Sequence, residues 1–203
     1  MEEYFTVRRE ARAEFTERRS RFIGAAKSVA TEAEAADFVR VVRARNREAK
    51  HNAFAFLLRT GAARCSDDGE PQGTAGVPVL GALQKSGVTD AAVVVTRYFG
   101  GVLLGAGGLV RAYSRAASLA LAAAGTVRKA ACFSAKLRCG YGQYGAVSPL
   151  IARHGGRVDG VAYAGLVELS FHIPCGAAGA FQADLADATR GECRAELGEK
   201  IFY

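Results

Sequence analysis

One continuous segment restricts the possible folds of this chain more than any other: an apolar strand that leads through a glycine-rich loop into a long helix. Residues 91–99 form a nearly continuous apolar run, which predicts a strand buried on both faces. The helix is expected to begin at Gly107 or Gly108 and to reach about Ala124, since Gly125 stands where a C-terminal glycine cap belongs. The segment therefore predicts a fold that mixes strands and helices.

The loop between this strand and this helix is in the right place to bind an anion. It lacks the Gly-Lys-Ser/Thr end of a P-loop, and Val110 does not fit a dinucleotide-binding motif. Two interpretations stay open: a tight strand-to-helix connection, or a surface that recognises an anion or a backbone, flanked by Arg97 and Arg111. Tyr98 and Phe99 could stack on bases, although one of the two is expected to face the core. The glycines concerned are Gly100, Gly101, Gly105, Gly107 and Gly108.

An acidic turn precedes the strand, in the segment Ser-Asp-Asp-Gly-Glu-Pro-Gln-Gly-Thr-Ala-Gly of residues 66–76. Its carboxylates belong to Asp67, Asp68 and Glu70. Three interpretations are open here. The carboxylates could hold Mg²⁺ if other ligands converge on them, they could bond backbone amides of their own turn or pair internally with Arg97 or Arg111, or they could contact a partner directly.

The rest of the chain predicts two domains, 1–127 and 128–203. In the first, Thr31 and Glu34 form a capping box that opens a helix of about sixteen residues. Its arginines Arg40, Arg43 and Arg47 are either a solvated face or a stripe that contacts phosphates. The other elements expected there are strands at 4–7, 20–29 and 51–58, a basic turn at 18–21 and a helix at 74–83.

The second domain has the order strand, helix, strand, strand, helix, strand, which is the split βαβ or ferredoxin-like arrangement. Pro149 is expected to interrupt or reset its first helix. The strands are predicted at 131–140, 157–162, 166–173 and 192–197, and the helices at 144–154 and 177–189.

The net charge and the composition limit the kinds of partner that this chain is expected to bind. The net charge is +7, and residues 1–128 hold 19 Lys and Arg against 13 Asp and Glu, whereas residues 129–203 hold 8 against 7. A basic first half suggests a polyanion such as RNA, although an arginine-rich soluble protein without such a partner would look the same. The five cysteines are far apart and form no Cys-x-x-Cys pair, which favours reduced thiols. The absence of a long apolar run or a signal-like N-terminus predicts a cytoplasmic protein without a membrane partner.

The motifs resemble those of the IMPACT/YigZ family. The resemblance rests on Ser20-Arg21-Phe22-Ile23, Ala49-Lys50-His51-Asn52, the acidic turn 66–76 and the segment from Arg97 to Tyr113. It covers roughly residues 15–125, and the remainder is similar in layout to the C-terminal domain of bacterial members.

This resemblance implies an α+β protein of two domains. The first would be a ribosomal-protein-like α/β sandwich, and the second a ferredoxin-like domain similar to the last domain of elongation factor G. Both folds recur in the translation apparatus, and eukaryotic relatives regulate translation by binding the activator of a starvation-sensing kinase. This chain lacks their additional N-terminal domain, so that partner is not expected here.

The sequence therefore predicts a non-enzymatic cytoplasmic protein that binds RNA, the ribosome or a translation-associated protein and regulates translation. The alternatives are a magnesium-dependent enzyme acting on a phosphorylated or nucleotide substrate, and a protein-binding adaptor that uses the acidic turn. We expect no cofactor, no resident metal and no catalytic residue. The residues expected to bind are Arg21, Asp67, Asp68, Glu70, Arg97, Tyr98, Gly100, Gly101, Gly105, Gly107, Gly108 and Arg111.

Overall fold

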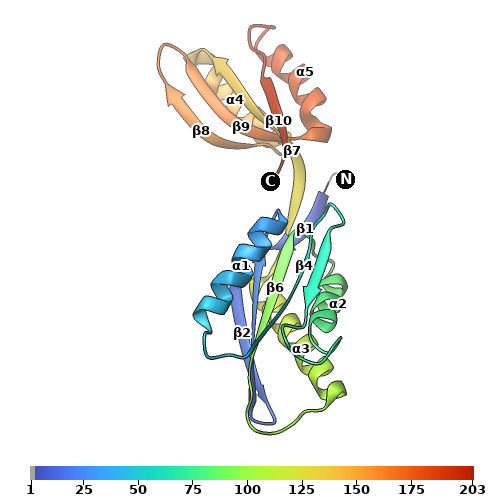
Figure 1. Ribbon diagram of the computed structural model, residues 1–203. Coiled ribbons are helices and arrows are strands. Elements are labelled where there is room, and N and C mark those ends of the chain that lie inside the picture. The colour runs from blue at the N-terminus through green and yellow to red at the C-terminus, as the bar shows by residue number, and fades with distance from the viewer. Residues whose placement is uncertain (1–2) are drawn as a thin grey trace. The chain divides into compact units, whose positions relative to one another are not determined.

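The computed structural model describes residues 3–203 and confirms the mixed α and β fold (Figure 1). Its described part contains five α-helices and two five-stranded sheets. The chain divides into two compact units, one of residues 4–128 and one of residues 129–203 together with residue 3. None of the helices in residues 3–203 combines the length and the apolar character needed to cross a lipid bilayer.

The N-terminal unit is a sheet with helices on both faces. Its strand order is β2-β3-β6-β4-β5, and every pair of neighbours is antiparallel. The elements are β1 (Glu3–Val7), β2 (Ala11–Glu17), β3 (Ser20–Ser28), α1 (Glu32–Arg45), β4 (His51–Leu57), β5 (Ala63–Ser66), α2 (Gly76–Ser86), β6 (Ala91–Tyr98) and α3 (Ala106–Ala124).

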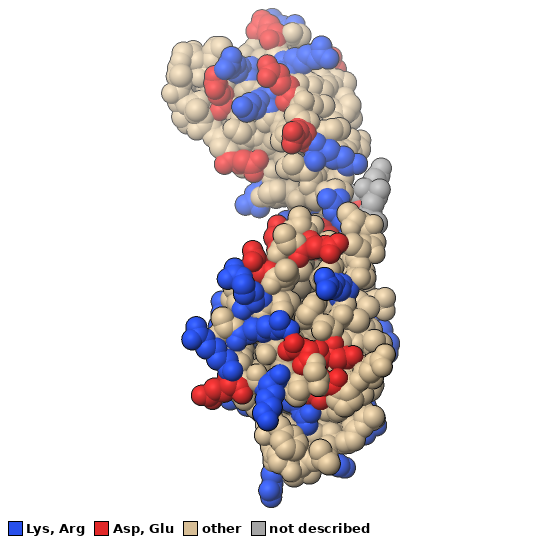
Figure 2. All heavy atoms as spheres, viewed as in Figure 1, with Lys and Arg blue, Asp and Glu red and all other residues tan. Residues whose placement is uncertain are grey.

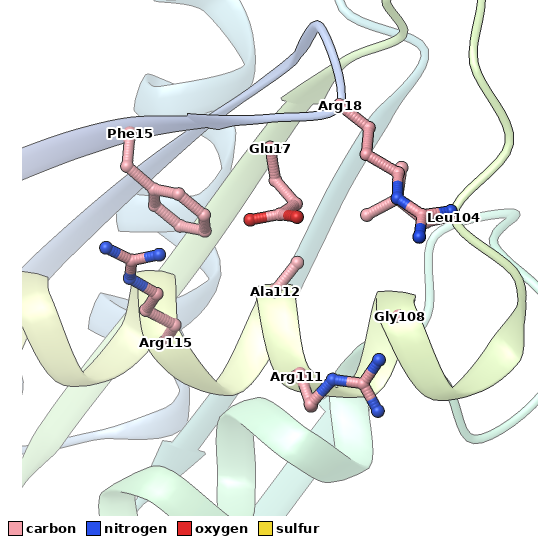
Figure 3. A pocket seen from close by; sticks show the side chains of 8 residues that line it. All are labelled: Phe15, Glu17, Arg18, Leu104, Gly108, Arg111, Ala112 and Arg115. Carbon is pink, nitrogen blue, oxygen red and sulfur yellow. The ribbon is translucent and has the colours of Figure 1, made fainter.

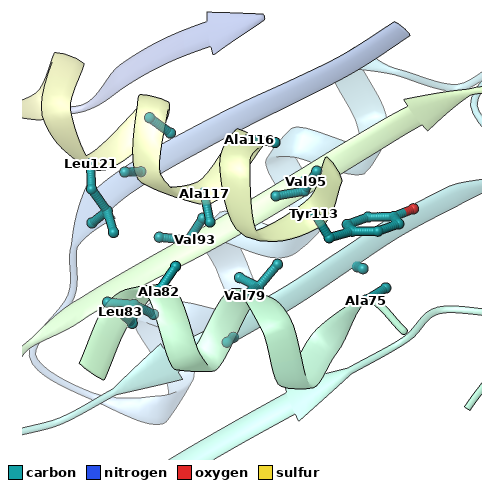
Figure 4. Packing of buried hydrophobic residues seen from close by; sticks show 14 of the residues in the cluster. Ala75, Val79, Ala82, Leu83, Val93, Val95, Tyr113, Ala116, Ala117 and Leu121 are labelled. Carbon is teal, nitrogen blue, oxygen red and sulfur yellow. The ribbon is translucent and has the colours of Figure 1, made fainter. Parts of the chain in front are cut away.

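The central strand β6 is buried on both faces, as its apolar sequence predicts. Val93 and Val95 pack in the core beneath α2 and α3 (Figure 4), and Val94, between them, packs in the core beneath α1. This alternation follows from the period of two residues along a strand. It also decides which side chains near the site share a face of the sheet.

Helix α3 lies unusually close to the sheet. The side of α3 that faces inward is rich in alanine, and β3 offers Gly24 beneath it. A Cβ built on Gly24 would lie 2.3 Å from the carbonyl oxygen of Ala116, a distance that no real Cβ atom can take. The small residues therefore fix α3 against β3 and, with it, the position of the helix N-terminus.

The β2–β3 hairpin has a two-residue loop, Arg18 and Arg19, because Glu17 pairs with Ser20. Both loop residues have positive φ angles, 43° and 65°, the geometry in which Asn-Gly is the preferred pair. The glycine-rich loop packs onto this turn. A Cβ on Gly100 would lie 2.0 Å from the carbonyl carbon of Arg19, so only glycine fits there.

The C-terminal unit has strands in the order β10-β7-β9-β8, with all pairs antiparallel, which is the split βαβ arrangement. Helices α4 and α5 cover one core that includes Leu137, Ile151, Phe171 and Phe181. The elements are β7 (Thr126–Cys139), α4 (Tyr141–Arg153), β8 (Arg157–Tyr163), β9 (Val167–Pro174), a 3₁₀ turn (Cys175–Ala177), α5 (Ala178–Ala188) and β10 (Glu196–Phe202).

Several sequence-based expectations were wrong in detail. Strands β2 and β5 were not predicted, and the last strand lies four residues further along than expected, at Glu196–Phe202. Pro149 does not interrupt α4, which runs from Tyr141 to Arg153. The carbonyl that loses its helical partner there belongs to Gly145, which is exposed, so water can take the place of the missing N–H.

Candidate functional site

The acidic turn is held by internal contacts, beginning with Asp67. Its carboxylate accepts hydrogen bonds from the backbone N–H groups of Gly73, Ala75 and Gly76 at 2.8–3.0 Å. No side chain caps α2 from its own N-cap position, so Asp67 does so from the preceding turn. Partial burial raises the pKa of Asp67, but the three amides outweigh it and hold the pKa below its ordinary value.

Asp68 joins the turn to α1 and β4. One carboxylate oxygen pairs with the guanidinium of Arg43, and the other accepts the backbone N–H of Asn52 at 2.7 Å. The carbonyl oxygen of Asp68 lies 2.9 Å from Nδ1 of His51. Asp68 itself has a positive φ of 49°, a conformation that these contacts maintain.

Glu70 lies at the centre of a buried charged cluster. Nη1 of Arg97 donates to both carboxylate oxygens of Glu70, at 2.8 and 3.1 Å, and the hydroxyl of Tyr113 donates to one of them at 2.7 Å. The side chains of Glu70 and Arg97 are 3% and 7% exposed. Burial, together with the neighbouring Glu70 carboxylate, raises the pKa of Tyr113 far above its ordinary value. The predicted internal ion pair with Arg97 is therefore confirmed for Glu70.

These contacts weaken the magnesium interpretation of the turn. The oxygens of Asp67, Asp68 and Glu70 point toward separate internal donors and do not converge on one another. Within residues 3–203 no group of three or more His, Cys, Asp or Glu side chains is arranged to hold a metal ion. A turn built for internal hydrogen bonds explains its three carboxylates more directly than a metal does.

The two faces of the sheet separate other predicted residues. Arg21 lies opposite Tyr98, on the α1 side, where the Tyr98 hydroxyl donates to the side chain of Asn46 at the end of α1. Arg21 is exposed and pairs with Glu14 at 2.9 Å. Arg97, one residue before Tyr98, points to the α2–α3 side, since neighbouring residues of a strand face opposite ways. Phe99 is 55% exposed, and the centroid of its ring lies 5.4 Å from the Arg97 guanidinium carbon.

The glycine-rich loop forms an uncapped helix start. Gly101 and Gly105 have positive φ angles of 82° and 71°, and no side chain caps the N-terminus of α3. The first turn of α3 also contains no acidic residue. The guanidinium of Arg111 folds back toward this turn, because a Cβ built on Gly107 would lie 3.5 Å from its Nη1 atom. The backbone N–H groups of the first turn thus lie near a cation at an exposed surface.

A cavity of about 300 Å³ lies between the β2–β3 hairpin and α3 (Figure 3). Three of its lining residues are arginines, Arg18 from the hairpin loop and Arg111 and Arg115 from successive turns of α3. Arg115 lies over the ring of Phe15, 4.5 Å from its centroid. The full lining is Phe15, Glu17, Arg18, Leu104, Gly108, Arg111, Ala112 and Arg115.

The structure thus brings together only part of the predicted site. Gly108 and Arg111 line the cavity, and Gly107 adjoins Arg111. None of the acidic-turn residues lines that cavity. Sequence reasoning missed the contribution of Phe15, Glu17, Arg18 and Arg115. The signals for it were present in the basic hairpin turn and in the spacing of four residues between Arg111 and Arg115, which places both on one face of a helix.

The arginines of α1 are mostly neutralised. Arg40 pairs with Asp37, Arg43 with Asp68 and Arg45 with Glu10. Figure 2 shows Lys and Arg side chains gathered on the α1 side of the N-terminal unit, with Asp and Glu beside them. This mixture favours the interpretation of a solvated face over that of a phosphate-binding stripe.

The fold and this geometry define an α+β protein of two compact units, the first of which has a basic cavity beside a glycine-rich loop. Residues 18–121 match the family described as the Impact N-terminal domain, and residues 137–192 match a domain of unknown function, DUF1949. The chain belongs to the IMPACT family.

Individual relatives agree with this assignment. The chain is 33% identical to the IMPACT family member YvyE of Bacillus subtilis (strain 168), over 98% of this chain and 93% of that protein. It is 39% identical to the IMPACT family member YigZ of Escherichia coli (strain K12), over 76% of this chain and 78% of that protein. A solved structure, described as that of a hypothetical protein, is 34% identical and covers 98% of both chains with a TM-score of 0.66.

Proposed function

We propose that this protein binds RNA or the ribosome in the cytoplasm through the N-terminal unit and thereby modulates translation, without catalysing a reaction. The observation that supports this proposal is the cavity between the hairpin and α3. Within residues 3–203, Arg18, Arg111 and Arg115 take part in no ion pair, and all three are exposed. Guanidinium groups without a carboxylate partner are suited to phosphate oxygens.

The backbone at the start of α3 also favours the binding of an anion. The uncapped N–H groups at the start of α3 and the positive end of this 19-residue helix favour a negative charge. The glycine-rich loop keeps side chains away from that end, so a sugar–phosphate backbone can come close. The excess of basic residues in residues 1–128 supplies longer-range attraction.

The alternatives have less support. A magnesium-dependent enzyme and an adaptor based on the acidic turn would both need carboxylates that are free to meet a metal or a basic partner. Asp67, Asp68 and Glu70 are each engaged in internal hydrogen bonds.

The test is the salt dependence of binding. Filter binding of purified ribosomal subunits and of a structured RNA is measured from low to moderate salt for the wild type, for R111A/R115A and for R12A. Arg12 is a matched control, since it is exposed and lies on the face of β2 opposite Phe15 and Glu17. Each lost phosphate contact should lower the slope of log affinity against log salt by about one.

We expect R111A/R115A to bind more weakly with a flatter slope, and R12A to bind like the wild type. Absence of any affinity at low salt, or equal slopes for all three proteins, contradicts the proposal.

A further inference from the structure

The cavity between the hairpin and α3 contains one acidic residue that a general RNA-binding surface does not explain. In Figure 3, Glu17 points from β2 toward α3, into the space between Arg18 and Arg115. In the part of the chain that the structure describes, Glu17 takes part in no ion pair. A carboxylate in this position weakens the attraction for the phosphates of an RNA backbone. Binding of such a backbone therefore does not account for Glu17.

The charges of the cavity match a particular kind of phosphate. Three arginines and one glutamate line it, which gives a formal charge of two positive units. An internal phosphodiester carries a single negative charge, whereas a phosphomonoester carries about 1.5 to 2 at neutral pH. The cavity therefore complements a terminal phosphate better than a phosphate within a chain.

Glu17 and the apolar lining suit the rest of a nucleotide. A carboxylate accepts hydrogen bonds from ribose hydroxyls, as acidic residues do in dinucleotide-binding folds. Leu104 and Phe15 provide apolar wall, and the Arg115 guanidinium, held over the Phe15 ring, is the kind of flat group on which a base stacks. The volume of about 300 Å³ is at the lower end of the range for small-molecule sites.

The backbone keeps one of these arginines in an unfavourable conformation. Arg18 has a φ of 43° in a hairpin loop that would be more stable with asparagine or glycine. The turn is supported from outside, because the Ser20 hydroxyl, next to it, accepts the N–H of Gly100 at 3.2 Å. Strain that the surroundings maintain at a cavity is a frequent mark of a binding site.

We propose that this cavity binds the 5′-phosphomonoester of a ribonucleotide, with the phosphate on Arg18 and Arg111, the ribose hydroxyls on Glu17 and the base on the Arg115 guanidinium. The same chemical group occurs at the 5′ end of a processed RNA and in a free nucleoside monophosphate. Binding of the 5′ end of an RNA rests on the proposed function, whereas binding of a free nucleoside monophosphate does not.

The experiment compares two RNAs that differ in one group. A short single-stranded RNA with a fluorophore at its 3′ end is prepared with a 5′-phosphate and with a 5′-hydroxyl, and anisotropy gives the affinity of the whole protein for each. Adenosine 5′-monophosphate is then added as a competitor, with inorganic phosphate as a second probe. The proteins are the wild type, R111A, E17Q and the control R12A.

We expect the wild type and R12A to prefer the 5′-phosphate by about tenfold, the contribution of one or two charged hydrogen bonds. R111A should lose this preference. E17Q should keep it, but with 2′-deoxyadenosine 5′-monophosphate as a third competitor, E17Q should discriminate less than the wild type between this compound and adenosine monophosphate. Because E17Q replaces a partly exposed side chain with one of the same shape, it keeps the test valid if R111A folds poorly.

The outcomes separate this inference from the proposed function. Equal, salt-dependent affinity for the two RNAs, with no competition by the nucleotide, overturns the inference and leaves RNA binding intact. Binding of adenosine monophosphate that depends on Arg111, without binding of either RNA, supports the inference and removes the proposed function. Absence of binding to any of the probes overturns both.

Discussion

Removal of the Glu70 carboxylate should destabilise the N-terminal unit more than the loss of any exposed ion pair. In Glu70→Ala, the guanidinium of Arg97 keeps its charge while its side chain is 7% exposed, and the hydroxyl of the fully buried Tyr113 loses its acceptor. The Nε atom of Arg97 has no hydrogen-bond partner even with Glu70 in place. Breaking a buried pair in this way costs about 3–5 kcal/mol, a large part of the 5–15 kcal/mol that stabilises a typical domain.

The size of the stability loss distinguishes a buried ion pair from an exposed one. The matched control is Glu14→Ala, which breaks a pair with Arg21 whose two side chains are 51% and 54% exposed. An exposed pair of this kind contributes no more than about 1 kcal/mol. Replacing both Glu70 and Arg97 by methionine should cost much less than Glu70→Ala alone, because it leaves no buried charge behind.

The assay must report on the N-terminal unit by itself. Native-state hydrogen exchange of the β3 and β6 amides gives the free energy of opening of that unit, and urea denaturation gives the overall stability. A loss below about 1 kcal/mol for Glu70→Ala, equal to that of Glu14→Ala, would refute the reasoning that this cluster is a buried charge network.

Three further changes follow from the same geometry. Asp67→Ala should cost about 0.5–2 kcal/mol at neutral pH, because three backbone amides lose their acceptor. Since the folded pKa of Asp67 is lowered, the difference in stability from the wild type should shrink as the pH falls below about 4. A pH-independent difference in urea titrations argues against the capping role. Gly24→Ala should lower the free energy of unfolding by about 1–3 kcal/mol or more, because the new methyl group would overlap the backbone of Ala116. An unchanged melting temperature would disprove this close approach. Arg18→Gly should stabilise the protein by up to about 1 kcal/mol, since glycine adopts the positive φ without strain. The same change should weaken RNA binding, because it removes the guanidinium. Lower stability in thermal melts would count against strain in this turn.

The sequence predicted those elements whose local pattern agrees with their environment. The predicted N-cap is confirmed, because the Thr31 hydroxyl accepts the Glu34 N–H, but the Glu34 carboxylate reaches back to the N–H of Ala30 rather than to that of Thr31, as a capping box requires. β6 was predicted because it is apolar throughout, and α3 because its start and end are both marked by glycine. In these segments local preference and tertiary packing favour the same structure.

The missed elements lack such a pattern. β2 alternates between partly buried and exposed residues, but only Ala11, Ala13 and Phe15 of its seven residues are apolar, which is too few to stand out. β5 has four residues and forms a strand because it pairs with β4, a partner that its own short sequence does not specify. Edge strands of this kind are defined by their neighbours more than by their own residues.

The candidate site was predicted in its residue types but not in its arrangement. The acidic turn and the glycine-rich loop are conspicuous in the sequence, yet Asp68 meets Arg43, which lies 25 residues earlier, and Glu70 meets Tyr113, which lies 43 residues later. Such long-range partners cannot be read from spacing along the chain. The cavity also needs the hairpin loop and α3, which are separated by almost ninety residues of sequence, to lie side by side.

The central claim is that RNA meets the protein at the hairpin loop and the start of α3. The most direct measurement is a ¹H–¹⁵N NMR titration of the whole protein with a 5′-phosphorylated RNA, in which each backbone amide reports on its own surroundings. We expect the largest shifts at Arg18, Arg19 and the first-turn amides of α3, Ala106 to Gly108. Shifts confined to the C-terminal unit or to α1, with those amides unchanged at saturation, would contradict it.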